Sequence, residues 1–473
     1  MTTLDRAETV HLSIPDLRAT IHGRVIAPDD ADYDAFRRVT SGAIDRRPAV
    51  IVQVADTDDV RTVIGVARDT GLELAVRSGG HSAAGHSVSE GGIVLDLTGM
   101  KGLDIDVEGR TAWAETGLTA AEYTAAVGEH GLVTGFGDTG SVGIGGITLG
   151  GGVGYLVRKH GLTIDDLLAA DVVTAEGKLL RTDAETEPDL FWAIRGGGGN
   201  FGVATRFQYR VHPLQTVTGG MLLLPATPDV IASFLTEAGS APDELSTIAN
   251  VMPAPPMPFV PEEHHGKPSV MALISYAGDP DEGERVLAPF RVLAKPLADM
   301  VRTMPYPEIY PPEDPSYRPV AAARTMFVDS VDRSVAETIL EDIQASSAQM
   351  AVTQLRVLGG ALARVPSDAT AFAHRGSRIM TNVAALYDPA TTPDPTEHEA
   401  WVAKLSDKLR QSDEGAYVGF LGDEGQERVR AAYPGSTWDR LREVKAAYDP
   451  SNLFRGNQNI PPAETWPPAV APD

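Results

Sequence analysis

Two glycine-rich segments hold the residues whose types and spacing could do chemistry. Residues 77–82 read Arg-Ser-Gly-Gly-His-Ser, and residues 143–154 read Gly-Ile-Gly-Gly-Ile-Thr-Leu-Gly-Gly-Gly-Val-Gly. We expect both to be loops whose unhindered backbone N–H groups form concave nests, which bind a pyrophosphate or a planar ring without cationic side chains. A tight turn without a ligand explains either segment alone about equally well. Two such segments in one chain favour a ligand.

Other motifs that would assign a cofactor or a metal are rejected or missing. Residues 197–202, Gly-Gly-Gly-Asn-Phe-Gly, fit the pattern of a dinucleotide-binding turn, but that turn must follow a strand and open a helix. Here a helix-like segment precedes the turn and an alternating, strand-like segment follows it. No phosphate-binding glycine-lysine loop, HExxH or EF-hand pattern occurs, so we expect no metal. The absence of cysteine excludes disulfides, thiolate ligands, cysteine nucleophiles and a cysteinyl bond to a cofactor.

The elements that must position the first glycine loop can be predicted from the apolar pattern around it. Residues 49–52 form an apolar run typical of a buried strand, and residues 56–59 supply N-cap candidates for a helix that Gly71 ends. Residues 73–76 predict a second strand, so the loop follows the carboxyl end of a strand. Further strands are expected at 93–97, 111–114 and 203–211, a hairpin at 171–180, and helices at 118–130 and from residue 189.

A second unit is expected after His212-Pro213, because the chain there becomes poorer in glycine and richer in proline. It extends to about residue 410, with predicted strands at 354–358 and 379–387 and predicted helices at 335–348 and 398–411. A last helix is expected at 438–447, before the sequence Tyr-Asp-Pro at 448–450 breaks it.

Composition and charge limit the classes of partner. The 473 residues carry a formal net charge of −25, which repels a phosphate backbone and an anionic membrane surface, so nucleic acid is not an expected partner. No stretch approaches the roughly 20 apolar residues that a membrane helix needs, and acidic residues stand where a signal peptide would carry its apolar region. The expectation is therefore a cytoplasmic protein without a membrane partner.

Four motifs in order along the chain resemble the FAD-linked oxidases of the vanillyl-alcohol-oxidase superfamily, in the berberine-bridge-enzyme-like branch. The resemblance spans nearly the whole chain. The motifs are Arg-Ser-Gly-Gly-His-Ser at 77–82, Val-Gly-Ile-Gly-Gly with Leu-Gly-Gly-Gly at 142–152, Asp-Leu-Phe-Trp-Ala-Ile-Arg-Gly-Gly-Gly at 189–198, and Tyr-Asp-Pro with Asn-Gln-Asn-Ile at 448–460.

The resemblance implies an α+β fold. It predicts a PCMH-type FAD-binding domain of two subdomains, and an α+β substrate domain whose antiparallel sheet roofs the flavin ring. Residues 1–212 are then the N-terminal part of the FAD domain, 213–410 the substrate domain, and 411–473 a segment that returns to the FAD domain.

The resemblance also assigns cofactor contacts. It implies that His81 is bonded to the 8α-methyl carbon of FAD and that its loop holds the pyrophosphate, while residues near 202 lie beside the adenine. His86 lies in a glycine loop but matches no family position, so a pocket or surface role is favoured over a family contact there. The cofactor-binding set expected on this basis is Arg77, Ser78, Gly79, Gly80, His81, Ser82, His86, Thr139, Ser141, Gly145, Gly146, Thr148, Gly150, Gly154, Gly202, Val203, Asn457 and Asn459.

Two positions depart from the family pattern. Many relatives attach FAD a second time through a cysteine where this chain has Thr139, and threonine cannot form that thioether, so a single covalent bond is expected. Many relatives also have a tyrosine base or substrate contact where this chain has Phe420. Tyr417, Tyr387 and Asn459 are therefore the candidates for the catalytic base, although each tyrosine could equally be a partly buried aromatic of a strand.

Tyr417 and Phe420 are expected on one strand. Residues three apart on a strand face opposite sides, so Tyr417 reaches the pocket only if a bulge at Gly419 restores the phase. Arg356 and the pair His374-Arg375 are also expected where the second sheet faces the flavin, with a solvated or ion-paired role as the alternative.

The activity implied is that of an oxidase, in which hydride passes from a small organic substrate to flavin N5 and dioxygen reoxidises the flavin to give peroxide. A dehydrogenase that uses another acceptor, and a silent binder of flavin or ligand, remain open because a fold does not fix a function. The partners expected are a small-molecule substrate and dioxygen, and the oligomeric state is open.

Overall fold

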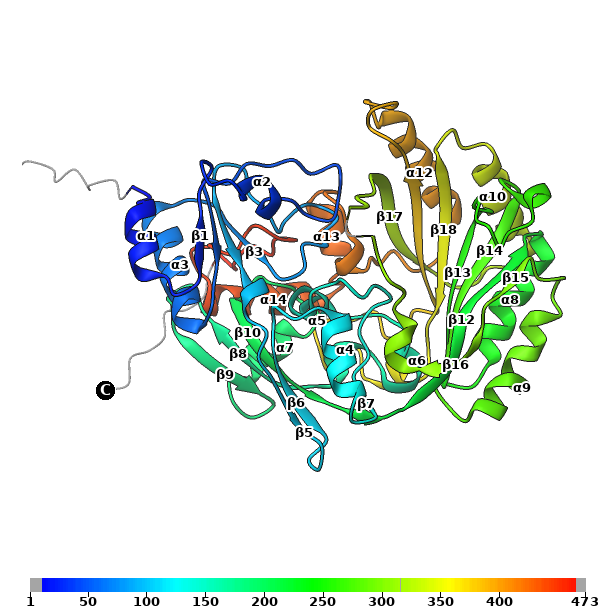
Figure 1. Ribbon diagram of the computed structural model, residues 1–473, viewed down its shortest axis with the longest axis horizontal. Helices are drawn as coiled ribbons and strands as arrows, with labels where there is room; N and C mark the ends of the chain where they lie inside the picture. Colours follow the sequence, from blue (N-terminus) through cyan, green and yellow to red (C-terminus); the bar gives the residue numbers. More distant parts are fainter. Residues whose placement is uncertain (1–10, 315, 465–473) are drawn as a thin grey trace, which may run out of the picture.

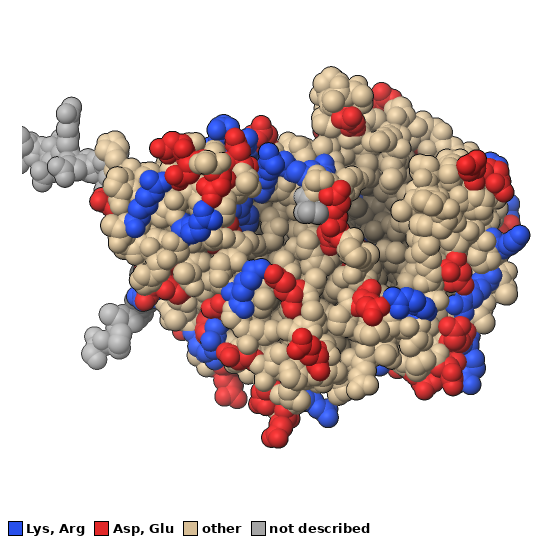
Figure 2. Space-filling view, in the orientation of Figure 1, with Lys and Arg blue, Asp and Glu red and all other residues tan. Residues whose placement is uncertain are grey.

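The computed structural model describes residues 11–314 and 316–464, which form two halves around a central hollow (Figures 1 and 2). Part of the N-terminal stretch on which the expectation of no signal peptide rests, residues 1–10, lies outside the described residues. No helix of the described residues is both long and apolar enough to cross a membrane. The mixture of helices with parallel and antiparallel sheets confirms the α+β class.

The first half begins with a four-stranded sheet in the order β1-β2-β4-β3, in which β2, β4 and β3 are parallel. Helix α3 packs on it through buried Val60, Val63 and Ile64. The Asp56 side chain accepts hydrogen bonds from two N–H groups of the first turn of α3, and Gly71 ends the helix with φ +68°. The bounds of these elements are α1 Ile14–Thr20, β1 Arg24–Ile26, α2 Tyr33–Phe36, β2 Val50–Gln53, α3 Thr57–Thr70, β3 Leu74–Arg77 and β4 Ile93–Asp96.

The strand, helix and strand predicted before the first glycine loop are therefore present. The sequence did not show that β4 would lie between the two predicted strands.

A five-stranded antiparallel sheet in the order β5-β6-β10-β8-β9 completes the first half. Its core includes a cluster of edge-to-face rings formed by Tyr123, Phe136 and Tyr209. The bounds are β5 Leu103–Asp106, β6 Thr111–Glu115, α4 Ala120–Gly128, β7 Leu132–Val133, α6 Val157–His160, β8 Leu167–Val173, β9 Leu179–Asp183, α7 Pro188–Ile194, β10 Val203–Arg210 and β11 His212–Pro213.

The sequence predicts a loop for the whole second glycine-rich segment, but part of this segment is helical. Ile144–Gly150 form helix α5, which the buried Ile144 anchors in the core of the first half. Glycine suits this helix because its backbone touches the first glycine loop: a β-carbon on Gly143 would lie 2.2 Å from the nitrogen of Gly79. On another side of α5, a β-carbon on Gly146 would meet nothing within 4 Å.

The second half is built on an eight-stranded antiparallel sheet, and helices α8, α9, α10 and α12 cover its outer face (Figure 1). The opposite face of β17, β18 and β19 turns toward the first half. The bounds are β12 Thr216–Pro225, α8 Pro228–Ser240, β13 Leu245–Pro253, β14 Pro268–Tyr276, α9 Pro280–Arg291, β15 Ala298–Asp299, β16 Arg302–Pro305, β17 Ala321–Val328, α10 Arg333–Gln344, β18 Met350–Val357, α11 Ala361–Arg364, β19 Ile379–Leu386 and α12 Thr396–Leu409.

The C-terminal segment returns to the first half, where α13 (Gln426–Ala431) and α14 (Ser436–Tyr448) lie among N-terminal elements (Figure 1). Helix α14 packs on α7. Lys445 on α14 is fully buried, and its ammonium donates to Asp449 at 2.7 Å and to the carbonyls of Asn200 and Phe454. Asp449 in turn accepts from two backbone N–H groups that follow it, so the chain after α14 is fixed in place.

Candidate active site

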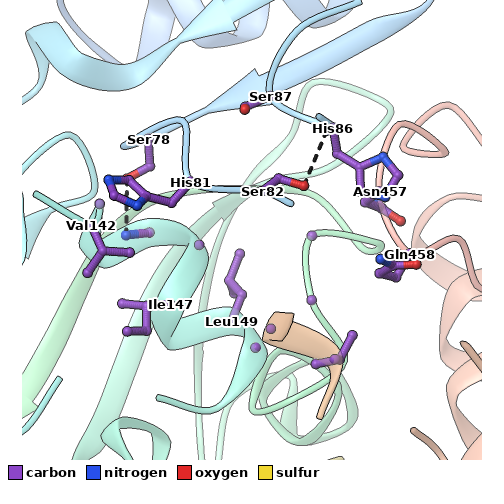
Figure 3. A pocket seen from close by; sticks show the side chains of 18 of the residues that line it. Ser78, His81, Ser82, His86, Ser87, Val142, Ile147, Leu149, Asn457 and Gln458 are labelled. Atoms are coloured by element: carbon purple, nitrogen blue, oxygen red, sulfur yellow. Dashed lines mark hydrogen bonds between the residues drawn. The ribbon is translucent and has the colours of Figure 1, made fainter. Parts of the chain in front are cut away.

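One cavity of about 570 Å³ lies between the two halves. Its walls come from the first glycine loop, helix α5, the turn at 198–204, the chain at 417–421 and 454–458, and strands β17, β18 and β19. Figure 2 shows the hollow on one face, and Figure 3 shows His81, Ser82 and His86 on one loop, with Asn457 and Gln458 on the C-terminal segment. A site of this size between two structural units is typical of a small-molecule or cofactor site.

Hydrogen bonds hold the first glycine loop against helix α5. The Ser78 hydroxyl donates to the carbonyl of Thr116 at 2.5 Å and accepts from the N–H of Gly145 at 3.2 Å. The loop therefore has a fixed position at the end of β3, and it presents the ring of His81 at the cavity wall.

His81 takes part in a row of hydrogen-bonded side chains that joins the two halves. Its Nε2 lies 3.0 Å from the Ser141 hydroxyl, and that hydroxyl donates to Glu313 at 2.5 Å. Burial lowers the pKa of His81, and the nearby carboxylate of Glu313 offsets part of that effect. The imidazole is therefore neutral near pH 7.

Four buried polar atoms of the wall have no hydrogen-bond partner among the described residues, and two of them, His86 Nε2 and Asn457 Oδ1, belong to the first glycine-rich region and the C-terminal segment. Burial, with a smaller effect of Arg46, lowers the pKa of His86 to about 4. Buried polar atoms are rarely left unpaired, so these two indicate a polar ligand. A β-carbon on Gly146 or Gly199 would also meet nothing within 4 Å, which leaves open space beside the wall. These features fit FAD, the polar molecule with a planar flavin ring that the sequence motifs predict.

Most of the predicted cofactor contacts lie together on this wall. They are Ser78, Gly79, Gly80, His81, Ser82, His86, Thr139, Gly145, Gly146, Gly150, Gly202, Val203 and Asn457. Tyr417, a predicted catalytic residue, lines the same cavity.

Four predicted cofactor residues do not line the cavity. The Arg77 guanidinium pairs with Asp96 at 2.6 Å, and the Thr148 hydroxyl bonds to that of Tyr209 at 2.8 Å. Gly154 lies so close to the carbonyl of Phe136 that a β-carbon would be 1.7 Å from its oxygen. Ser141 reaches the cavity only through its bond to His81. These residues support the wall rather than form it.

Tyr387 and Asn459 are not part of the cavity wall. The ring of Tyr387 packs on His398, with centroids 5.0 Å apart, at the far end of β19. Asn459 follows the wall residues Asn457 and Gln458, but its side-chain oxygen is buried away from the cavity.

The expected strand at Tyr417 is wrong. Val418–Phe420 form a single turn of 3₁₀ helix, in which residues three apart lie on the same side. Tyr417 and Phe420 therefore both face the cavity, with ring centroids 5.2 Å apart, and no bulge at Gly419 is needed. The Tyr417 hydroxyl accepts from the N–H of Gly152 at 3.1 Å, and burial raises the pKa of this phenol.

A row of polar side chains on the large sheet forms the opposite wall. Arg356 is 4% exposed, and its guanidinium donates to Asp138 at 2.7 Å and to Gln354, and it lies 5.0 Å from the ring centre of Phe420. Asn382 stands beside Gln354 on the next strand, and its Oδ1 has no partner among the described residues.

The sequence analysis identified Arg356 but missed Asp138, Gln354 and Asn382. Polar residues at alternating positions of the apolar strand β18, Gln354 and Arg356, were the signal that could have found this wall.

The other charged pair expected to face the flavin does not line the cavity. Arg375 makes a two-point ion pair with Asp165, at 2.7 and 2.8 Å, and the ring of His374 stacks on Phe327. In the described ranges, His22, Asp56 and Asp59 bring three possible metal ligands together. The carboxylate of Asp56 already accepts the backbone N–H of Asp59, and that of Asp59 accepts the backbone N–H groups of His22 and Gly23.

Comparison with known proteins agrees with the site. Residues 48–183 match the model of the FAD binding domain, and residues 416–461 match the model described as berberine and berberine like. The site and fold thus define an FAD-linked oxidoreductase.

Two relatives extend the match over nearly the whole chain. Over 461 residues the chain is 30% identical to (R)-6-hydroxynicotine oxidase of Paenarthrobacter nicotinovorans, a match that covers 94% of this chain and 97% of that protein. It is 28% identical over 447 residues to the xylooligosaccharide oxidase of Thermothelomyces thermophilus, with 88% of each chain covered.

The solved structure of 6-hydroxy-D-nicotine oxidase from Arthrobacter nicotinovorans has a TM-score of 0.82 at 27% identity, over 94% of this chain and 98% of that one. The chain therefore belongs to the berberine-bridge-enzyme-like family of FAD-linked oxidoreductases, which confirms the resemblance drawn from its motifs.

Proposed function

We propose that this enzyme is an oxidase that holds FAD covalently through His81, takes a hydride from a small organic substrate and passes the electrons to dioxygen. The observation that carries the proposal is one continuous cavity, which joins the His81 loop to the polar wall of the large sheet. Two relatives that cover most of the chain are named oxidases, which supports the same reaction class.

FAD, when bound, supplies the redox chemistry, because its ring accepts a hydride and later gives electrons to dioxygen. The residues of this chain hold and orient it. The glycines of the first loop and of α5 admit its backbone contacts, and His86 and Asn457 offer it two buried polar atoms. Since Thr139 cannot form a thioether, His81 is the single attachment point.

The opposite wall bears on the substrate class. Arg356 and Asp138 neutralise each other, so this wall has no uncompensated charge to attract an ionic substrate. Its remaining polar groups include two acceptors, the carbonyl oxygen of Asn382 and the second oxygen of Asp138, beside the amide nitrogen of Asn382, which donates. Acceptors beside the ring of Phe420 suit a substrate that carries hydroxyl or amine groups.

The test is to screen the purified protein for hydrogen peroxide release with a panel of sugars, alcohols, amines and phenols that includes 6-hydroxynicotine and xylo-oligosaccharides. We expect peroxide in proportion to the substrate oxidised. Turnover with an artificial dye but none with dioxygen would show a dehydrogenase instead. If no member of the panel reduces the flavin, so that its absorption stays unchanged, the protein is not an oxidase of these substrate classes.

Acid precipitation tests the covalent bond separately. We expect the wild-type pellet to stay yellow, and His81→Ala to leave its flavin in the supernatant. A colourless wild-type pellet would refute the histidyl bond while leaving the oxidase activity open to test.

A further inference from the structure

Glu313 lies between the two halves, and its carboxylate binds Ser141, the residue that contacts His81. It belongs to the chain between the short helix at Tyr306–Ile309 and strand β17, and so to the second half. Its Oε2 accepts the Ser141 hydroxyl at 2.5 Å, and its Oε1 accepts the N–H of Ser141 at 3.0 Å. The Ser141 hydroxyl oxygen is 3.0 Å from His81 Nε2. The three side chains form one continuous hydrogen-bonded row.

The chemistry of these groups fixes the direction of each hydrogen bond. An ionised carboxylate only accepts, so the Ser141 hydroxyl gives its one hydrogen to Glu313. The hydroxyl oxygen must then accept from His81, which places the hydrogen of the neutral imidazole on Nε2. The lone pair of His81 is therefore on Nδ1, and the ring has the tautomer and orientation of a nucleophile at that atom.

We propose that Glu313, acting through Ser141, is the positioning residue that activates His81 for covalent attachment of FAD. This inference rests on the covalent bond of the proposed function. It assigns Nδ1 as the linking atom and Glu313 as the group that receives the Nε2 proton.

The attachment balances as follows. A bond forms between His81 Nδ1 and the 8α carbon of the flavin, and one C–H bond of the 8α methyl group breaks with loss of a proton. The Nε2 proton passes to Ser141, and the hydroxyl proton of Ser141 passes to Glu313. The electron pair left on the flavin is taken up by dioxygen, which leaves as hydrogen peroxide with two protons, the one lost from the 8α carbon and the one that Glu313 releases again.

The row is more than a tether between the two halves. The backbone N–H of Ser141 already binds one oxygen of Glu313, so docking of this segment does not need the hydroxyl. The other carboxylate oxygen of Glu313 accepts the hydroxyl of Ser141, and this hydroxyl oxygen also contacts His81. Burial, which lowers the pKa of His81, keeps the ring in the neutral form that attacks.

The test compares the full-length wild type with Glu313→Gln and Ser141→Ala, each produced with little flavin and then supplied with FAD in air. The measurement is the rate at which flavin becomes resistant to acid precipitation, beside the amount of FAD bound before precipitation. Loss of a proton acceptor typically costs 10²-fold or more, so we expect attachment roughly 10²-fold slower in both variants, with unchanged FAD binding and thermal unfolding. Ser141→Thr keeps the hydroxyl and should restore the rate.

Glu308→Gln is the matched control, because Glu308 lies on the preceding turn and pairs with Arg302 at the surface. The inference would be overturned if FAD attached to Glu313→Gln at the wild-type rate. It would also be overturned if attachment slowed only in proportion to weaker FAD binding. Either result would leave the proposed oxidase activity unaffected. A wild type that releases all its flavin would instead refute the covalent bond itself. A flavin peptide linked through Nε2 would also overturn the inference.

Discussion

Of the three predicted candidates for the base, Tyr417, Tyr387 and Asn459, Tyr417 alone lines the cavity. Its surroundings do not suit a base. A phenol acts as a base only after it ionises, and burial raises its pKa. Its oxygen already accepts the N–H of Gly152. The geometry instead gives this hydroxyl two uses: it supports the turn after α5, and it offers a hydrogen to a ligand.

Tyr417→Phe is therefore expected to change the rate of flavin reduction by less than tenfold in a stopped-flow experiment. It should lower the free energy of unfolding by about 1–3 kcal/mol, because the buried N–H of Gly152 loses its partner. Phe420→Leu, which changes the adjacent ring and breaks no hydrogen bond, is the control. A 10²–10⁴-fold loss of reduction rate at unchanged flavin content would show that the phenolate is the base after all.

Thr139 bears on the proposed number of covalent bonds to the flavin. It lies on the cavity wall, but its side chain has no sulfur to bond the ring. Mass spectrometry of a proteolytic digest should find flavin on one peptide only, the one that contains His81. Flavin on the peptide around Thr139 would contradict the single attachment.

At the scale of the element, α14 and the chain after it depend on one buried ion pair. The side chains of Lys445 and Asp449 are both 0% exposed, and burial lowers the pKa of Lys445. Removing one partner of a buried pair leaves the other uncompensated, which costs about 3–5 kcal/mol. Lys445→Ala should lower the free energy of unfolding by that amount in a urea titration, and FAD content should fall because Asn457 is displaced.

Arg440→Ala is the comparison on the same helix. Arg440 pairs with Asp189 at the surface, and exposed pairs contribute about 0–1 kcal/mol. Equal losses in the two variants would show that the buried pair has no special weight.

Elements with a strong apolar pattern could be predicted from the sequence, and those that glycine dominates could not. Strands β2 and β3 and helix α3 are where the apolar period placed them. Helix α5 was missed because glycine disfavours helices by propensity, and tertiary packing of Ile144 overrides that preference. The turn at 418–420 was taken for a strand because three residues carry no clear period.

Site residues divide in the same way. The residues that the motif around His81 predicts lie together on one side of the cavity. The pair of Arg356 and Asp138 was missed because its members are 218 residues apart and meet only when the two halves assemble.

At the scale of the whole molecule, buried histidines make stability depend on pH. His160 stacks on His212 with ring centroids 3.9 Å apart, and burial, with the neighbouring His212 and Lys159, lowers the pKa of His160 to about 3. Its unfolded value is about 6.5. Between these values the unfolded chain binds a proton at this site that the folded protein does not, so stability falls as the pH falls.

Urea titrations from pH 8 to pH 4.5 should show unfolding free energy that is steady above about pH 7 and declines below it. His160→Gln should decline less steeply than the wild type, whatever its stability at pH 8. His130→Gln, which changes a histidine with an exposed side chain, should keep the wild-type slope. Parallel curves for wild type and His160→Gln would rule out this contribution.

The cavity wall contributed by residues 417–421 and 454–458 sets the order of events during synthesis. A ribosome makes the His81 loop early, but these segments emerge more than three hundred residues later, so the nascent chain has an incomplete cofactor site for most of its translation. If FAD is attached through His81 as proposed, we expect attachment to be a late event that needs a completed and folded chain. A protein cut short before α13 would then be left without flavin, and hence colourless. The flavin absorbance of a preparation would therefore report the fraction of full-length, folded molecules.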